Sequence, residues 1–249
     1  MRIANTDETN APGSLIADLW RFGNGEPFTI ICAQLPAEMR AIIPYADPTS
    51  PDYIALYTYA DLDTLFEIHG HVRFVNPASQ VDLRAAGQLM PDDYTTHLVS
   101  LGGVDWNLAT RSVLDHLRLP VEQVARDTTE GSYFEVDGGD GKVRHAPRLE
   151  NSAERQVLRE DVALFARATN PYNRERTVTI CNGMYGSGTL GAVRALTDVR
   201  FRVRNAEYVE TRFAHSDSFC ILTRVTVENG VPLTPDWTIA KNRLFEWAS

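Results

Sequence analysis

The sequence has few cysteines, no long apolar run and no excess of basic residues. Its three cysteines show no CxxC or Cys/His spacing of a zinc site, so no metal site is predicted. Each cysteine lies in an apolar, strand-like run, which favours buried, reduced thiols and a cytoplasmic location. No apolar stretch approaches the roughly 18 residues that a membrane span needs, and the polar, acidic start is typical of neither a signal nor a transit peptide. No membrane partner is therefore expected.

The net charge of −9 at pH 7 argues against direct nucleic-acid binding, because a phosphate backbone requires a basic face. A small anionic ligand is still compatible with this charge, since backbone N–H groups at a helix start hold phosphate without lysine. The composition, with 43% hydrophobic and 23% charged residues, is that of an ordinary globular protein. A single domain of 249 residues buries roughly three quarters of its unfolded surface and folds without disulfides or metals.

Apolar runs alternate with helical patterns along the chain. Residues 1–27 are expected to form a tail and a short helix, and residues 28–249 a single domain in which 121–150 are a β-hairpin insertion around an acidic, glycine-rich turn. Strands alternating with helices predict a Rossmann-like α/β fold, with a mostly parallel sheet and helices on both faces. The expected strands are 28–33, 53–59, 80–86, 97–101, 162–169, 177–181 and 219–227, and the main helices are 61–69, 105–117, 187–196 and 206–213.

Two strand–glycine–helix junctions carry the functional prediction. The first is Gly102-Gly103, where glycine permits the positive φ of a tight turn and lets a ligand approach the backbone. The second is Gly183–Thr189, which resembles a phosphate-cradling loop but lacks the P-loop lysine and the dinucleotide G-x-G-x-x-G order. Gly191 costs about 1 kcal/mol relative to alanine inside the helix, which indicates close packing on the sheet.

If both strands run the same way, both turns meet at one edge of the sheet, where doubly wound folds bind ligands. Tyr57, Tyr59 and Trp106 offer aromatic faces on which a base could stack. The predicted ligand-binding residues are Gly102, Gly103, Asp105, Trp106, Asn107, Asn182, Gly183, Tyr185, Gly186, Ser187, Gly188 and Thr189. Each turn also has a purely structural interpretation, as a glycine turn followed by a capped helix.

The segments YTYADLDTLFEIHGHVRFVNP, HLVSLGGVDWN, VALFARATNPYNRERTVTICNGMYGSGTLGAVRAL and NRLFEW together resemble an uncharacterised domain of actinobacterial, and hence bacterial, proteins. The resemblance spans roughly residues 28–247. Relatives of this type often carry a helix-turn-helix regulator module in front of the domain. The resemblance implies a Rossmann-like fold and a sensing or effector role in signalling or defence. Residues 1–27 are too short and too acidic for such a module, so direct DNA binding is not expected.

Three functions follow from these features. The first is a sensor that binds a nucleotide-like or phosphorylated small molecule and thereby changes its homo-oligomeric state or its contact with a regulatory protein. The second is an enzyme, a nucleotide or NAD glycohydrolase, because a helix carboxylate beside a sheet edge is able to hold a ribose and stabilise positive charge. The third is a structural interaction module. The sequence leaves open whether any reaction is catalysed and indicates no particular cofactor; the candidate carboxylates are Glu67, Asp105 and Asp61.

Overall fold

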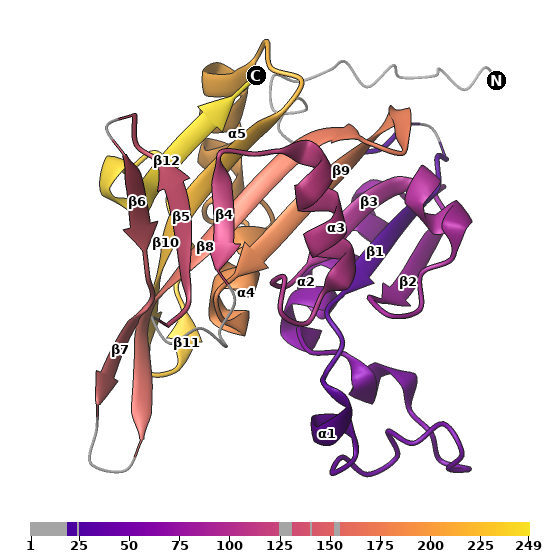
Figure 1. Cartoon of the computed structure of the whole chain (residues 1–249). Helices are drawn as coiled ribbons and strands as arrows, with labels where there is room; N and C mark the ends of the chain where they lie inside the picture. The colour runs from indigo at the N-terminus through magenta and orange to yellow at the C-terminus, as the bar shows by residue number, and fades with distance from the viewer. Residues whose placement is uncertain (1–18, 24, 125–130, 140, 152–154) are drawn as a thin grey trace, which may run out of the picture.

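The computed structural model describes residues 19–23, 25–124, 131–139, 141–151 and 155–249 (Figure 1). The expected N-terminal tail and most of the first helix lie outside these residues. The strands are β1 (Phe28–Cys32), β2 (Val81–Ala85), β3 (His97–Leu101), β4 (Val121–Val124), β5 (Tyr133–Asp137), β6 (Lys142–His145), β7 (Arg148–Asn151), β8 (Gln156–Asn170), β9 (Asn173–Gly183), β10 (Phe219–Glu228), β11 (Val231–Pro232) and β12 (Arg243–Ala248). The helices are α1 (Ala37–Arg40), α2 (Leu62–Val75), α3 (Leu108–Leu117), α4 (Gly186–Arg194) and α5 (Arg202–Phe213), with 3-10 turns η2 (Ala55–Thr58), η3 (Pro91–Thr95) and η4 (Ala240–Asn242).

The main sheet is mixed, so the prediction of a mostly parallel Rossmann-like sheet is wrong. Its order is β11-β10-β8-β9-β3-β1-β2, with β12 paired to β10 and β7 to β8. Only β2, β1, β3 and β9 run parallel to one another, whereas β8, β10 and their neighbours pair antiparallel. The reason is the short turn between Asn170 and Asn173, which joins β8 to β9 as a hairpin. A parallel pairing would have needed a crossover of a dozen or more residues.

The two faces of the main sheet are covered differently, which also departs from the expected helices on both faces. Helices α2, α4 and α5 cover one face and bury side chains such as Ile68 and Val193 against Phe165 and Ile30. The opposite face is covered by α3 and by the small antiparallel sheet β4-β5-β6, which contributes Phe134. Figure 1 shows this small sheet beside β8, where the sequence predicts a hairpin insertion.

The aromatic segment at 53–59 is not a strand, contrary to the prediction. It forms η2 and then makes one isolated bridge, between Tyr59 and Gln34. Several side chains in this region are exposed, including Leu56 and Tyr57. A strand rich in aromatic residues is stabilised by packing on its neighbours, and here no neighbouring strand pairs with the segment apart from the single bridge. No helix among the described residues is long and apolar enough to cross a membrane.

Gly191 in α4 packs directly on the sheet, as the sequence indicates. A Cβ at this position would lie 2.7 Å from both methyl carbons of Val225 on β10, a fully buried residue. Gly70, in the middle of α2, is the natural contrast, because a Cβ there would meet nothing within 4 Å. Close packing therefore requires glycine at position 191 but not at position 70.

We predict opposite effects for the two helix substitutions. Gly70→Ala should stabilise the protein by about 1 kcal/mol, the difference in helix propensity. Gly191→Ala should destabilise it, because overpacking of a well-packed core costs roughly 1–3 kcal/mol. Urea denaturation checks both values. In a Val225→Ala background, Gly191→Ala should cost less stability than in the wild type. An equal loss of stability in both backgrounds would contradict the packing explanation.

A buried histidine links three parts of the parallel half. His97, at the start of β3, lies 2.9 Å through Nε2 from Glu26 Oε2, and its Nδ1 accepts the Thr177 backbone N–H at 3.0 Å. This arrangement suits a neutral imidazole that donates to the carboxylate. Burial lowers the pKa of His97 below its ordinary 6.5, and the hydrogen bond from His97 lowers the pKa of Glu26 below 4.5.

Because both pKa values are lowered in the folded state, the protein loses stability as the pH falls. Because the folded-state pKa of His97 is depressed, its contribution is present above pH 6.5 and is lost as the pH falls through its folded pKa. The contribution of Glu26 is lost in the same way below pH 4.5. His71 and His145 have pKa values lowered by burial and act in the same direction as His97.

We therefore predict that the free energy of unfolding falls between pH 7.5 and pH 5.5. Chemical denaturation at several pH values measures this slope. His97→Gln should flatten the slope in part, whereas His116→Gln, at an exposed position on α3, should leave it unchanged. Equal slopes in wild type and His97→Gln would rule out the assigned role of His97.

Candidate functional site

The carboxyl ends of three parallel strands lie side by side and bring the two glycine turns together. Cys32 at the end of β1 pairs with Leu101 of β3, which in turn pairs with Cys181 of β9. The Gly102 N–H continues this ladder by donating to the Cys181 carbonyl at 3.0 Å. The sequence expectation that both turns meet at one sheet edge is confirmed by this register.

This edge is also where the direction of the chain crossovers changes. After β1 the chain enters α2, on the face shared with α4 and α5, whereas after β3 it enters α3 on the opposite face. In open α/β sheets a ligand crevice forms outside the carboxyl ends of the strands at such a switch point. The position of the site thus depends on the parallel strands β1, β3 and β9 and does not require a fully parallel sheet.

Two adjoining pockets lie at this edge, and we call them the turn pocket and the outer pocket. The turn pocket has a volume of about 130 Å³, and the outer pocket about 220 Å³. They share Ala60, Asp61 and Gly186 on their walls. Together they reach the lower end of the roughly 300–1,000 Å³ that small-molecule sites occupy. The turn pocket is lined by Ala33, Ala60, Asp61, Gly103, Asp105, Trp106, Gln123, Gly183, Met184, Tyr185, Gly186 and Thr189.

Asp61 occupies the position between the two glycine turns. It is the N-cap residue of α2, as the sequence predicts, but its side chain makes no cap hydrogen bond. A Cβ on Gly102 would lie 2.6 Å from its Oδ2, and a Cβ on Gly186 would lie 3.5 Å from its Oδ1. Gly102 also has the positive φ, +95°, expected for the first turn. The missing side chain of Gly102 therefore leaves space that the Asp61 carboxylate occupies, whereas a Cβ on Gly186 would make only an ordinary contact with it.

The first turn supplies a second carboxylate and an aromatic ring. Asp105 and Trp106 both line the turn pocket, and Trp106 is 36% exposed. Asn107 does not line it: its side chain caps α3 by accepting the Thr110 N–H at 3.0 Å and donates to the Leu101 carbonyl at 2.8 Å. Asn107 is thus a structural residue, whereas the two residues before it face the pocket.

The floor beneath Gly103 is polar. The Asn182 side chain donates to Gln123 Oε1 at 2.8 Å, and the same oxygen accepts the Val104 N–H at 2.9 Å. The Asn182 Oδ1 is buried and has no hydrogen-bond partner among the described residues. A Cβ on Gly103 would lie 3.3 Å from this oxygen and 2.8 Å from Gln123 Nε2. Any side chain at Gly103 would therefore fill the pocket floor.

The start of α4, expected to hold a phosphate, is held instead by an internal carboxylate. Asp161 on β8 is completely buried and accepts the Gly188 N–H at 2.6 Å and the Tyr185 N–H at 3.1 Å through Oδ2. Its Oδ1 accepts the Val162 N–H at 2.8 Å. A carboxylate at a helix N-terminus satisfies the free N–H groups and the positive end of the dipole. These two N–H groups of the second turn are therefore already used.

The glycines of the second turn serve mainly this internal packing. A Cβ on Gly188 would lie 2.7 Å from Asp161 Oδ2, and one on Gly183 only 2.3 Å from the Thr189 backbone nitrogen. The Thr189 hydroxyl accepts the Gly183 N–H at 3.1 Å. Within the second turn, the turn pocket is lined by Gly183, Met184, Tyr185, Gly186 and Thr189, and Ser187 lines the outer pocket. The structure thus assigns Gly188 to the turn itself and Gly186 to the pocket.

Glu67, the third predicted carboxylate, lies away from this site. It lines neither pocket and accepts a hydrogen bond from the Thr197 hydroxyl at 2.7 Å, across the contact between α2 and the end of α4. Cys32 is nearby but unsuited to nucleophilic chemistry, because burial, and then the charge of Asp61, raise the pKa of its thiol to about 12. All three cysteines are free and buried, as predicted.

The walls of the two pockets are acidic. Asp61, Asp105 and Asp63 contribute carboxylates, and no lysine or arginine is among the described residues that line either pocket. The predicted site residues did not include Asp161. The available signal was an acidic residue placed directly before the apolar run 162–166. Sequence reasoning also missed Gln123, which comes from the small sheet and carries no signal in the sequence. Ala33 and Ala60 also line the turn pocket and were not predicted as site residues.

No protein-family model matches the chain, and no curated protein matches its sequence. The resemblance to an actinobacterial domain therefore stays a prediction. The assignment of function to this chain rests on the geometry of the site.

We predict that Asp161→Asn destabilises the protein by roughly 2–4 kcal/mol, since a buried carboxylate with charge-assisted hydrogen bonds is replaced by an amide that opposes N–H donors. Thermal and chemical denaturation measure the loss. Glu175→Gln, at an exposed position on β9, is the matched control and should change stability by less than about 0.5 kcal/mol.

Amide hydrogen exchange gives the local test. In Asp161→Asn the Gly188 and Tyr185 amides should exchange faster than those in the middle of α4. Unchanged protection of both amides would exclude Asp161 as the group that holds this turn.

Proposed function

We propose that the turn pocket and the outer pocket bind a nucleoside-like small molecule, recognised by its hydroxyls and its base, and that this chain acts as a ligand sensor. The observation that carries the proposal is the pair of carboxylates, Asp61 and Asp105, beside the exposed ring of Trp106 at the switch point of the sheet. Carboxylate oxygens accept hydrogen bonds from vicinal hydroxyls, as an acidic residue does for ribose in dinucleotide-binding folds. An aromatic face stacks on a base without requiring charge.

The same geometry supports recognition of the nucleoside part and argues against phosphate contact within the pockets. Asp161 already accepts two N–H groups at the start of α4. The described lining offers carboxylates and no basic side chain, and like charges this close repel. A phosphorylated ligand would therefore have to direct its phosphate out of the pockets toward solvent.

A second candidate is hydrolysis of a glycosidic bond in the same ligand. Asp61 lies on the wall that both pockets share, so a ribose seated there would place its anomeric carbon near a carboxylate. Such a carboxylate stabilises the positive charge that develops as the bond to the base breaks. Glu67 is not part of this proposal because it lies outside both pockets. We also propose a cytoplasmic location, which the three free thiols suit.

We predict that nucleosides raise the melting temperature. A ligand present at 100 times its Kd stabilises the folded state by about 2.7 kcal/mol, or very roughly 5–10 °C for a chain of this size. The measurement is a thermal-shift series with nucleosides and their monophosphates at 1 mM. Nucleosides should act at least as strongly as the monophosphates; a response to the monophosphates alone would contradict the proposal.

Three variants refine the test. Asp61→Asn and Asp105→Asn should each weaken nucleoside binding by about tenfold, the equivalent of 1.4 kcal/mol, while Asp92→Asn, on η3 at the other end of the parallel strands, should bind normally. Trp106→Phe should abolish the ligand-induced change in tryptophan fluorescence. Chromatography of the same mixtures detects base release, and gel filtration detects a ligand-dependent change of oligomeric state. Normal binding by both site variants would remove the carboxylates from the proposal.

A further inference from the structure

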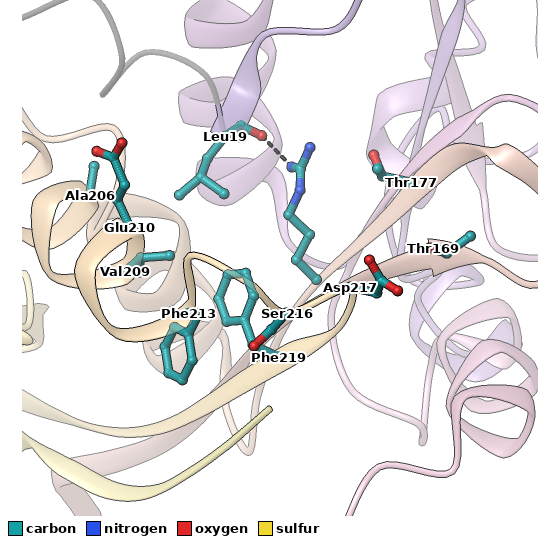
Figure 2. Close-up of a pocket in the computed structure, with 11 residues that line it drawn as sticks. Leu19, Thr169, Thr177, Ala206, Val209, Glu210, Phe213, Ser216, Asp217 and Phe219 are labelled. Atoms are coloured by element: carbon teal, nitrogen blue, oxygen red, sulfur yellow. Dashed lines mark hydrogen bonds between the residues drawn. The ribbon is translucent and has the colours of Figure 1, made fainter. Parts of the chain in front are cut away.

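A cavity of about 330 Å³ lies at the opposite end of β9 from the glycine turns. We call it the arginine pocket. Thr177, on its wall, is six residues before Gly183, or about 20 Å along an extended strand. The arginine pocket is bounded by α5, by the beginning of β10 and by Leu19 (Figure 2). Its lining residues are Leu19, Arg167, Thr169, Thr177, Ala206, Val209, Glu210, Phe213, Ser216, Asp217 and Phe219.

One side of the arginine pocket is apolar and the other carries hydroxyls. In Figure 2 the side chains of Val209 and Phe213 on α5 lie on the left, and Thr169 and Thr177 lie on the right. Thr169 of β8 pairs with Thr177 of β9, so the two threonines are cross-strand neighbours. Thr177 Oγ1 lies 3.0 Å from His97 Nδ1, whereas no hydrogen bond of the Thr169 hydroxyl is found within the described residues.

Arg167 brings a positive charge into this pocket from β8. Its Nη1 donates to the Leu19 carbonyl, drawn as the dashed line in Figure 2, and to Thr179 Oγ1 at 3.3 Å. Within the part of the chain that the structure describes, Nε and Nη2 have no hydrogen-bond acceptor, and no carboxylate lies within ion-pair distance. Glu210 and Asp217 also line the pocket, but both are exposed side chains.

A half-buried guanidinium that lines a pocket and has no ion pair within the described residues is available to an anionic ligand. Charged groups removed from water are normally paired, because desolvation costs several kcal/mol per ion. The Arg167 side chain is half-buried, and desolvation lowers the pKa of its guanidinium to about 10, so the group stays charged at neutral pH. Arg presents its N–H groups as a planar fork that matches a carboxylate in bidentate geometry. The chemistry around Arg167 is therefore complementary to a carboxylate.

We propose that the arginine pocket binds a small organic monocarboxylate with an apolar body, such as a medium-chain fatty acid. The carboxylate would accept hydrogen bonds from Nε and Nη2 of Arg167 and from the Thr169 hydroxyl. The apolar chain would lie along Val209, Phe213 and Phe219. This site is independent of the nucleoside site, since none of its lining residues lines the turn pocket or the outer pocket.

The proposal predicts that octanoate binds and that octanol and octylamine, with the same apolar body, bind at least tenfold more weakly. Isothermal titration calorimetry and thermal shifts on the full chain measure this difference. Arg167→Met should abolish octanoate binding and raise the stability of the ligand-free protein, because it removes a desolvated charge. Arg174→Met, at an exposed position on β9, should change neither.

Two further variants keep the test decisive if Arg167→Met does not fold. Arg167→Lys keeps the positive charge but loses the planar pair of N–H donors, and it should weaken octanoate binding by about tenfold. Val209→Trp should exclude the apolar chain and leave nucleoside binding unchanged. Equal affinities for octanoate and octanol, no octanoate binding at millimolar concentration, or unchanged binding in Val209→Trp would each overturn the proposal. None of these outcomes depends on the nucleoside site.

Discussion

The buried carboxylate of Asp161 fixes the start of α4 against the antiparallel half of the sheet. It belongs to β8, in the antiparallel half, and it accepts the N–H groups of Tyr185 and Gly188, where the parallel strand β9 turns into α4. The missing side chain of Gly188 is what allows this approach. Because α4 begins where Asp161 fixes it, Tyr185 and Gly186 face the turn pocket, and the candidate site inherits its shape from this one interaction.

The same interaction determines what the site is suited to bind. With Asp161 at the start of α4, the dipole and free N–H groups that would attract a phosphate already have an anion. The pocket beside it gains further carboxylates from Asp61 and Asp105. At the far end of β9 the half-buried Arg167 brings a positive charge into a pocket with aromatic and aliphatic side chains on one side. One strand therefore connects the acidic turn pocket to the arginine pocket.

Local signals in the sequence were reliable where backbone geometry alone decides. The buried runs that became β1 and β3, the positive φ of Gly102 and the close packing of Gly191 were all predicted. The strand predicted at 53–59 was wrong, since apolar and aromatic content specifies a strand only where a partner strand is present. The direction of β8 was missed although the short turn at Asn170 already excluded a parallel crossover.

The sequence by itself determined that two glycine turns follow buried strands, that the thiols are buried, and that Asp105 and Trp106 follow the first turn. It did so because turns, apolar runs and neighbours in the chain depend on local chemistry. Only the tertiary structure decided that Asp61 lies between the turns, that Asp161 occupies the start of α4, and that Arg167 lines a pocket beside α5. These contacts join residues from distant elements, and their geometry depends on strand order and register, which no local pattern specifies.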